Sequence, residues 1–203
     1  MSFGDLCLIL ISFFILLLSY STINQKKADI MREAVQSKTT PLEQAKKDSL
    51  TAVSKRIENE IKRLKLEKNA QVTFDEAGVA IEFKDGLLFS VGSASSNPNF
   101  QEVVGQVMRL IASTPEKYQL RIEGHTDDIP IKTPQYASNW ELSSARGIAL
   151  MHQFALKGVD ESRLSVVAYA QTRPKRPTLG LAGKALAQAR AANRRVVIRI
   201  EPK

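Results

Sequence analysis

The first pattern along the chain is a run of apolar residues close to its start. Between residues 6 and 18 only Ser12 interrupts the hydrophobic side chains, and residues 3–20 carry a single charge, that of Asp5. About 17 to 25 apolar residues suffice for a helix that crosses a bilayer. The run lacks the basic start and the small-residue cleavage site of a secretory signal. We therefore predict an uncleaved transmembrane helix within residues 1–23.

Polar side chains recur inside this run at intervals of seven, at Asp5, Ser12 and Ser19. That interval places them on roughly one face of a helix. A narrow polar stripe suits a buried protein interface, and a charged residue within a membrane usually marks an ion path or a partner. The alternative is that Asp5 lies at the membrane edge and caps the helix. The pattern alone leaves both interpretations open.

The charges around the run bear on its orientation. Lys26, Lys27 and Arg32 follow the run, and no basic residue precedes it. The positive-inside rule would then place the rest of the chain in the cytoplasm. Features of the C-terminal part favour the opposite side. We therefore expect either a basic segment before Met1 or a partner protein that fixes the orientation.

Residues 24–70 have the pattern of a linker. Residues 24–40 are polar, and "TTP" at 39–41 interrupts them. From residue 41 to residue 68 the apolar positions step by three or four, which predicts an amphipathic helix. These positions are Leu50, Val53, Ile57, Ile61 and Leu64. Such a stripe could pair with a second copy or pack on the following domain, and we favour packing.

Strand and helix patterns alternate in the remaining domain, residues 71–203. Residues 78–83 alternate as a strand does, and the pattern predicts further strands over residues 118–124, 163–170 and 194–201. Helical spacing covers residues 99–113, 138–158 and 183–193. Ser138 followed by Glu141 has the form of a capping box at the start of the middle helix. The order βαβαβαβ predicts an α/β sandwich with helices packed on a mixed sheet.

Composition narrows the classes of function. The formal charge is +8, but acids are interspersed with the bases, and no nucleic-acid motif is found, so we expect no nucleic-acid partner. There is no nucleophile–base pair and no glycine-rich phosphate loop. His125 and His152 form no spaced ligand set, so we predict no metal, no cofactor and no enzyme activity. We expect His125 to make structural hydrogen bonds and Trp140 to anchor the core.

Three motifs in order carry a family resemblance: "IEGHTDDIPI" at 122–131, "SNWELSSAR" at 138–146 and "ARAANRRVVIRI" at 189–200. They resemble the OmpA-like peptidoglycan-binding domain, over about residues 72–201. With "FGD" at 3–5 opening the apolar run, the chain resembles the MotB family. MotB proteins are the ion-channel and anchor subunits of the bacterial flagellar stator.

The resemblance implies a role for each part of the chain. Asp5 would carry H⁺ or Na⁺ beside a MotA-like multi-pass partner, and residues 24–40 would form a channel plug. The chain would be a dimer within a ring of partner subunits. It would cross the bacterial inner membrane once, with the C-terminal domain in the periplasm.

The resemblance also implies a binding site for diaminopimelate of the peptidoglycan stem. This ligand presents an ammonium and a carboxylate on one carbon, so a binder needs an anion and a bidentate cation. By the resemblance, Asp127 takes the ammonium and Arg146 the carboxylate, while Asn139 and Thr126 line the pocket. The plainer alternatives are a turn former at Asp127, a surface residue at Arg146 and a helix cap at Asn139.

Two other functions fit the same residues. One is a passive tether between the inner membrane and the peptidoglycan, for which Asp5 would be replaceable. The other is a MotB-like motor outside the flagellum, in gliding or phage defence. The sequence also departs from the family at "AYAQ", residues 168–171, where alanines replace the usual glycines, so we expect altered loop geometry there.

Overall fold

The computed structural model describes residues 3–20, 41–75, 77–90, 92–97 and 105–203, with side chains described outside residues 16–20 and 41–49. The chain divides into two compact units, Met1–Asp48 and Ser49–Lys203. The expected plug, residues 24–40, lies outside the described residues. The helix α3, Pro41–Arg63, runs across the division between the units, so the later part of the predicted linker helix belongs with the sheet.

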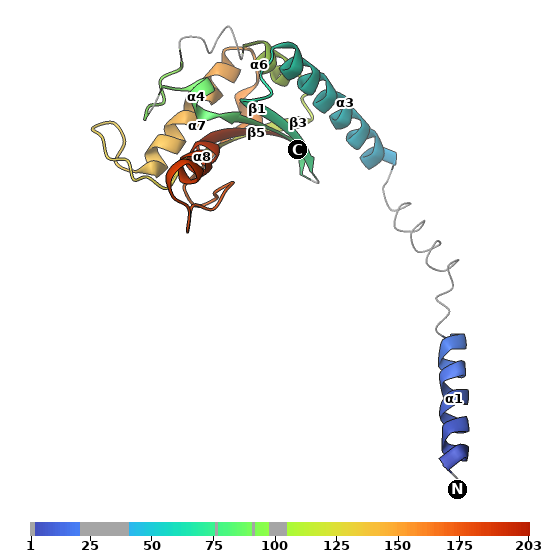
Figure 1. The fold of residues 1–203 in the computed structure, drawn as a ribbon. Coiled ribbons are helices and arrows are strands. Elements are labelled where there is room, and N and C mark those ends of the chain that lie inside the picture. Colours follow the sequence, from blue (N-terminus) through green and yellow to red (C-terminus); the bar gives the residue numbers. More distant parts are fainter. Residues whose placement is uncertain (1–2, 21–40, 76, 91, 98–104) are drawn as a thin grey trace. The chain divides into compact units, whose positions relative to one another are not determined.

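The first unit contains the helix α1, Phe3–Tyr20, in the place where the apolar run predicts a helix (Figure 1). Most of its described apolar side chains are exposed, and Ser12 Oγ donates a hydrogen bond to the carbonyl of Ile9 at 2.9 Å. In the described part of the chain, no helix meets the combined length and hydropathy expected of a membrane span. The helix is therefore confirmed, and its membrane crossing stays a prediction.

The second unit is built on a five-stranded mixed sheet (Figure 1). The strands are β1 Ala70–Asp75, β2 Gly78–Lys84, β3 Tyr118–His125, β4 Leu164–Ala170 and β5 Arg195–Pro202. Their order across the sheet is β1-β2-β5-β3-β4, with β3 and β4 parallel and every other neighbouring pair antiparallel. The predicted mixed α/β fold is confirmed. Strand β1 adds an edge strand that the sequence pattern did not predict.

Helices join the strands in the expected order. They are α4 Asp85–Leu88, α6 Gly105–Ala112, α7 Asn139–Ala155 and α8 Gly183–Asn193, with a 3₁₀ turn at Glu161–Arg163. The capping prediction is confirmed, because Ser138 Oγ accepts a hydrogen bond from Trp140 N at 3.2 Å. Helix α7 ends three residues before the predicted limit, ahead of Gly158, whose φ of +83° suits a left-handed turn.

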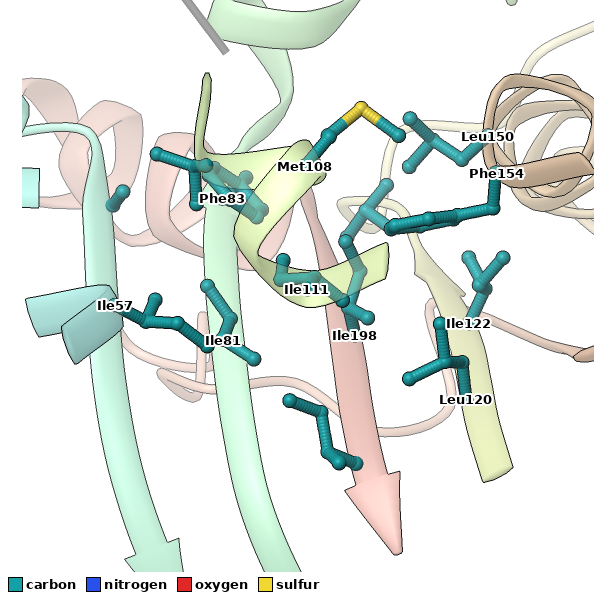
Figure 2. Packing of buried hydrophobic residues seen from close by; sticks show 14 of the residues in the cluster. Ile57, Ile81, Phe83, Met108, Ile111, Leu120, Ile122, Leu150, Phe154 and Ile198 are labelled. Carbon is teal, nitrogen blue, oxygen red and sulfur yellow. The ribbon is translucent and has the colours of Figure 1, made fainter. Parts of the chain in front are cut away.

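The hydrophobic core lies between the sheet and helices α3, α6 and α7 (Figure 2). Fully buried side chains from the strands meet side chains from the three helices. The strands contribute Ile81, Phe83, Leu120, Ile122 and Ile198, and the helices contribute Ile57, Met108, Ile111, Leu150 and Phe154. Leu50 and Ile61 of α3 are buried in the same cluster, so the apolar stripe of this helix packs on the domain, as favoured from the sequence.

Two glycines allow α7 to approach the sheet closely. A Cβ atom on Gly124 of β3 would lie 2.3 Å from the carbonyl oxygen of Ser143, and one on Gly147 would lie 2.4 Å from Cγ1 of Val166 in β4. Both distances are shorter than real Cβ contacts, so a side chain at either position would force its neighbour to shift. The close approach sets the position of the first half of α7, which carries Asn139 and Arg146.

Candidate ligand-binding site

A cavity of about 390 Å³ lies where the loop after β3 meets the start of α7, α4 and the end of α8. This volume is in the range of small-ligand sites. The four side chains predicted to bind the ligand all line it, namely Thr126, Asp127, Asn139 and Arg146. Asp85, Phe89, Ile129, Ile131 and Arg194 also line it.

Asp127 follows the end of β3 and is 7% exposed. Its Oδ1 accepts a hydrogen bond from the backbone N–H of Ile129 at 3.2 Å, which is the local turn that the plainer alternative anticipates. Its Oδ2 lies 2.6 Å from Nη1 of Arg194. The carboxylate therefore both shapes the loop and forms an ion pair with Arg194, a residue from the C-terminal part of the sequence.

Arg146 is 1% exposed, so the alternative that it is a surface helix residue is wrong. Its Nη2 lies 2.9 Å from Oδ2 of Asp85, and its Nε donates a hydrogen bond to the carbonyl of Ser93 at 3.0 Å. The guanidinium carbon lies 5.6 Å from the ring centroid of Phe89. Burial lowers the pKa of Arg146, and the Asp85 carboxylate opposes that shift.

Asn139 and Thr126 hold the backbone of the loop that carries Asp127. Asn139 Nδ2 donates to the carbonyl of Ile129 at 3.0 Å and to that of Asp127 at 3.4 Å. Thr126 Oγ1 donates to the carbonyl of Asp127 at 3.0 Å, and Thr126 N donates to the carbonyl of Ala170 at 2.8 Å. The cap of α7 is Ser138, so Asn139 is not the helix cap.

Sequence reasoning missed Asp85 and Arg194 as members of the site. Asp85 is 5% exposed, and burial raises the pKa of its carboxyl to about 6, against the opposing charge of Arg146. Arg194 lies in the "NRRV" segment, which contributed to the resemblance without receiving a role. The sequence feature that could have indicated Asp85 is its position, because this acid stands between a buried strand and the apolar segment "LLF" at 87–89.

Two further expectations need correction. Trp140 does not anchor the core, because it lies in the first turn of α7 and is 46% exposed. His125 is buried, but among the described residues neither ring nitrogen has a hydrogen-bond partner, and Nε2 lies 3.7 Å from Oε2 of Glu123. The ring instead stacks on Tyr169 with centroids 5.2 Å apart, and burial lowers the pKa of His125.

Asp5 lies in the other compact unit, in the first turn of α1, and is exposed. This position agrees with a residue near a helix end, and it also keeps Asp5 on the face shared with Ser12. Both interpretations of Asp5 therefore stay open.

Two family models match the chain. One, described as the OmpA family, matches residues 88–194, which is more than half of the chain. The other, described as membrane MotB of the proton-channel complex MotA/MotB, matches residues 1–38. Proteins of these two families are not enzymes, and neither is this chain.

Individual relatives agree with these matches. The uncharacterized protein YtxE of Bacillus subtilis is 30% identical over 85% of this chain and 78% of its own length. Motility protein B of B. subtilis is 29% identical over 78% of this chain, but this chain spans only 59% of that protein. The solved structure of the cell wall anchor of the T6SS from Pseudomonas aeruginosa superposes with a TM-score of 0.60 at 26% identity, covering 71% of this chain and 96% of that one.

Proposed function

Because the chain belongs to the OmpA family and begins with a MotB plug region, we propose that it is the wall-anchored subunit of a MotB-like ion-driven stator. In this proposal α1 crosses the bacterial inner membrane once, and the second unit lies in the periplasm. Asp5 carries H⁺ or Na⁺ beside a multi-pass MotA-like partner, and two copies of the chain form a dimer within the complex. The complex powers motility.

The observation that carries the anchoring role is that the buried side chains of Asp127 and Arg146 line one cavity. The residues are nineteen positions apart in the sequence, yet the strand–loop–helix arrangement brings an acid and a guanidinium to the lining of one cavity. Arg146 would accept the carboxylate of a diaminopimelate end group, and Asp127 the ammonium on the same carbon. Charge-assisted hydrogen bonds of this kind contribute about 1.5–3 kcal/mol each.

The ion-carrying role rests on the titratable acid in the apolar helix. A charged side chain within a membrane is costly, and proton binding or sodium occupancy at such a carboxylate changes the local charge by one. Each change can bias a conformational equilibrium in a partner that contacts the two forms differently. Torque generation then requires a fixed stator, which the wall-binding domain would provide.

A passive tether is the second candidate. The similarity to the cell wall anchor of the T6SS favours it, because that protein also anchors to the wall. A motor that serves gliding or phage defence would use Asp5 as the flagellar one does. A tether would not need Asp5 at all, so replacing this residue separates the tether from either motor.

Co-sedimentation of the full-length protein with purified peptidoglycan tests the anchoring role. We expect Asp127→Ala and Arg146→Ala to move most of the protein into the supernatant, because each leaves one ligand charge without its partner. Glu116→Ala and Arg56→Ala remove an acid and a base that are exposed and lie outside the cavity, so they should sediment as the wild type does. Unchanged sedimentation of both site variants would refute the binding role of the cavity.

A further inference from the structure

Two residues that line the cavity each have a buried polar atom without a hydrogen-bond partner in the described structure. These atoms are Oδ1 of Asp85 and Nη1 of Arg146, and they belong to the two side chains that pair through Oδ2 and Nη2. Buried donors and acceptors are nearly always satisfied, and each one left without a partner costs about 1–3 kcal/mol. A ligand that supplies a donor to Asp85 and an acceptor to Arg146 would remove both costs.

Asp127 is less available than Asp85 in this structure. Its two carboxylate oxygens are engaged by Arg194 and by the N–H of Ile129. Asp85 keeps one oxygen for a ligand, although it also pairs with an arginine. The acid with a free acceptor is therefore the one that the sequence motif did not indicate.

From these contacts we infer that Asp85 binds the ammonium group of the ligand directly, in addition to Asp127, while the neighbouring Arg146 binds the carboxylate. This inference rests on the proposed function and deepens it, because it assigns a further binding residue to the same cavity. The chemical class of the ligand is an α-amino acid end group in its zwitterionic form.

The balance of charge in the cavity fits such a ligand. Two acids, Asp85 and Asp127, face two bases, Arg146 and Arg194, so the four groups sum to no net charge. A cavity lining without net charge neither attracts nor repels a zwitterion as a whole. Its separate acids and bases can still pair with each of the two ligand charges. The backbone N–H of Asp85 donates to the carbonyl of Arg194 at 3.1 Å, which fixes the two ion pairs next to each other.

The protonation of Asp85 gives the inference a second signature. Burial raises the pKa of this carboxyl to about 6, with Arg146 and Arg194 opposing the shift and Asp127 adding to it. Asp85 is therefore mostly ionised at neutral pH and accepts a proton below about pH 6. Because a neutral acid attracts an ammonium much less strongly, binding of an amino ligand should weaken as the pH falls through this range.

The test compares two ligands, meso-diaminopimelate and pimelate. Pimelate has the same carbon chain and the same two carboxylates but no amino groups. Titration calorimetry on the full-length protein measures both. We expect Asp85→Asn to weaken diaminopimelate binding about tenfold or more and to leave pimelate binding within about twofold. The decline of diaminopimelate binding below pH 6 should also disappear in this variant. Asp85→Glu keeps the charge and should retain part of the preference for the amino ligand.

Each outcome has a separate meaning. Equal weakening of both ligands by Asp85→Asn would show that Asp85 only positions Arg146, and unchanged binding of both would show that it has no role; either result overturns the inference. Wild-type protein that binds neither diaminopimelate nor peptidoglycan would instead refute the proposed function, and the inference with it. Thermal unfolding of each variant separates a lost contact from a lost fold.

Discussion

Arg146 is the bulkiest side chain that the described part of the chain buries completely. Taking a guanidinium out of water costs several kcal/mol, even when it is paired. Asp85, the carbonyl of Ser93 and the ring of Phe89 offset part of this cost. An apolar side chain could fill the same space without this cost, so stability alone does not explain Arg146, and the proposed ligand-binding role would.

Asp85 should make the stability of the domain depend on pH. Its carboxyl has a pKa of about 6 when folded, against an ordinary value of 3.8. Between these values the folded state holds a proton that the unfolded state has released. The resulting stabilisation is complete below about pH 4 and is lost as the pH rises through about 6. The two pKa values correspond to a difference of about 3 kcal/mol.

We therefore predict a different pH dependence of stability for the wild type and for Asp85→Asn. Between about pH 4 and about pH 7.5, the unfolding free energy of the wild type should fall by up to about 3 kcal/mol more than that of the variant. Urea unfolding at the two pH values measures this difference. Other acids, such as Asp75, whose pKa is lowered by its hydrogen bond from Arg199, are present in both proteins and cancel. A gap between the two proteins that stays constant with pH would contradict the assignment.

At the scale of elements, the site depends on how closely α7 packs against β3 and β4. Gly147 faces Val166 across this contact, and valine is stiff about χ1, so it cannot easily move aside. Adding a methyl group to Gly147 should push α7 outward and displace the adjacent Arg146 from the cavity wall.

We predict that Gly147→Ala lowers the free energy of unfolding by about 1–3 kcal/mol through overpacking and also weakens peptidoglycan binding. In a Val166→Ala background, which removes the clashing Cγ1, the same change should cost little. Gly105→Ala in α6 serves as the control, because its added Cβ would only contact the flexible end of Arg109 at 3.8 Å. Equal costs of Gly147→Ala in both backgrounds would contradict the packing argument.

Periodicity predicts those elements whose burial is regular. Strands β2 and β5 are buried over most of their length, and both follow from their apolar runs. Strand β1 lies at the sheet edge with most side chains exposed, so its pattern gave no comparable signal. Trp140 lies at the helix start, as predicted, but its place in the first turn of α7 leaves the side chain 46% exposed and outside the core.

The site was only partly predictable for a different reason. Asp127 and Arg146 belong to a motif within a short stretch of chain, and a resemblance could indicate both. The partner Asp85 directly follows β2, and the partner Arg194 directly precedes β5. Those strands are neighbours in the sheet but lie far apart in the sequence, and only the fold brings their ends to the cavity.

At the scale of the whole molecule, the proposal joins two functions in one chain. The first unit contains an acid in an apolar helix, and the second contains the cavity that we propose to bind peptidoglycan. These functions are physically independent, because one depends on charge in a low-dielectric segment and the other on two ion pairs in a folded domain. Variants that remove one function should therefore preserve the other.

Ion flux through the full-length protein, produced together with a MotA-like protein as the proposed partner, tests the central claim most directly. Flux should be measured under separate proton and sodium gradients, with Asp5 intact and with Asp5→Asn, alongside peptidoglycan co-sedimentation of both proteins. We predict flux under one of the two gradients for the wild type, no flux above background for Asp5→Asn, and equal sedimentation of the two. Undiminished flux in Asp5→Asn, or no flux in the wild type under either gradient, would contradict the stator proposal.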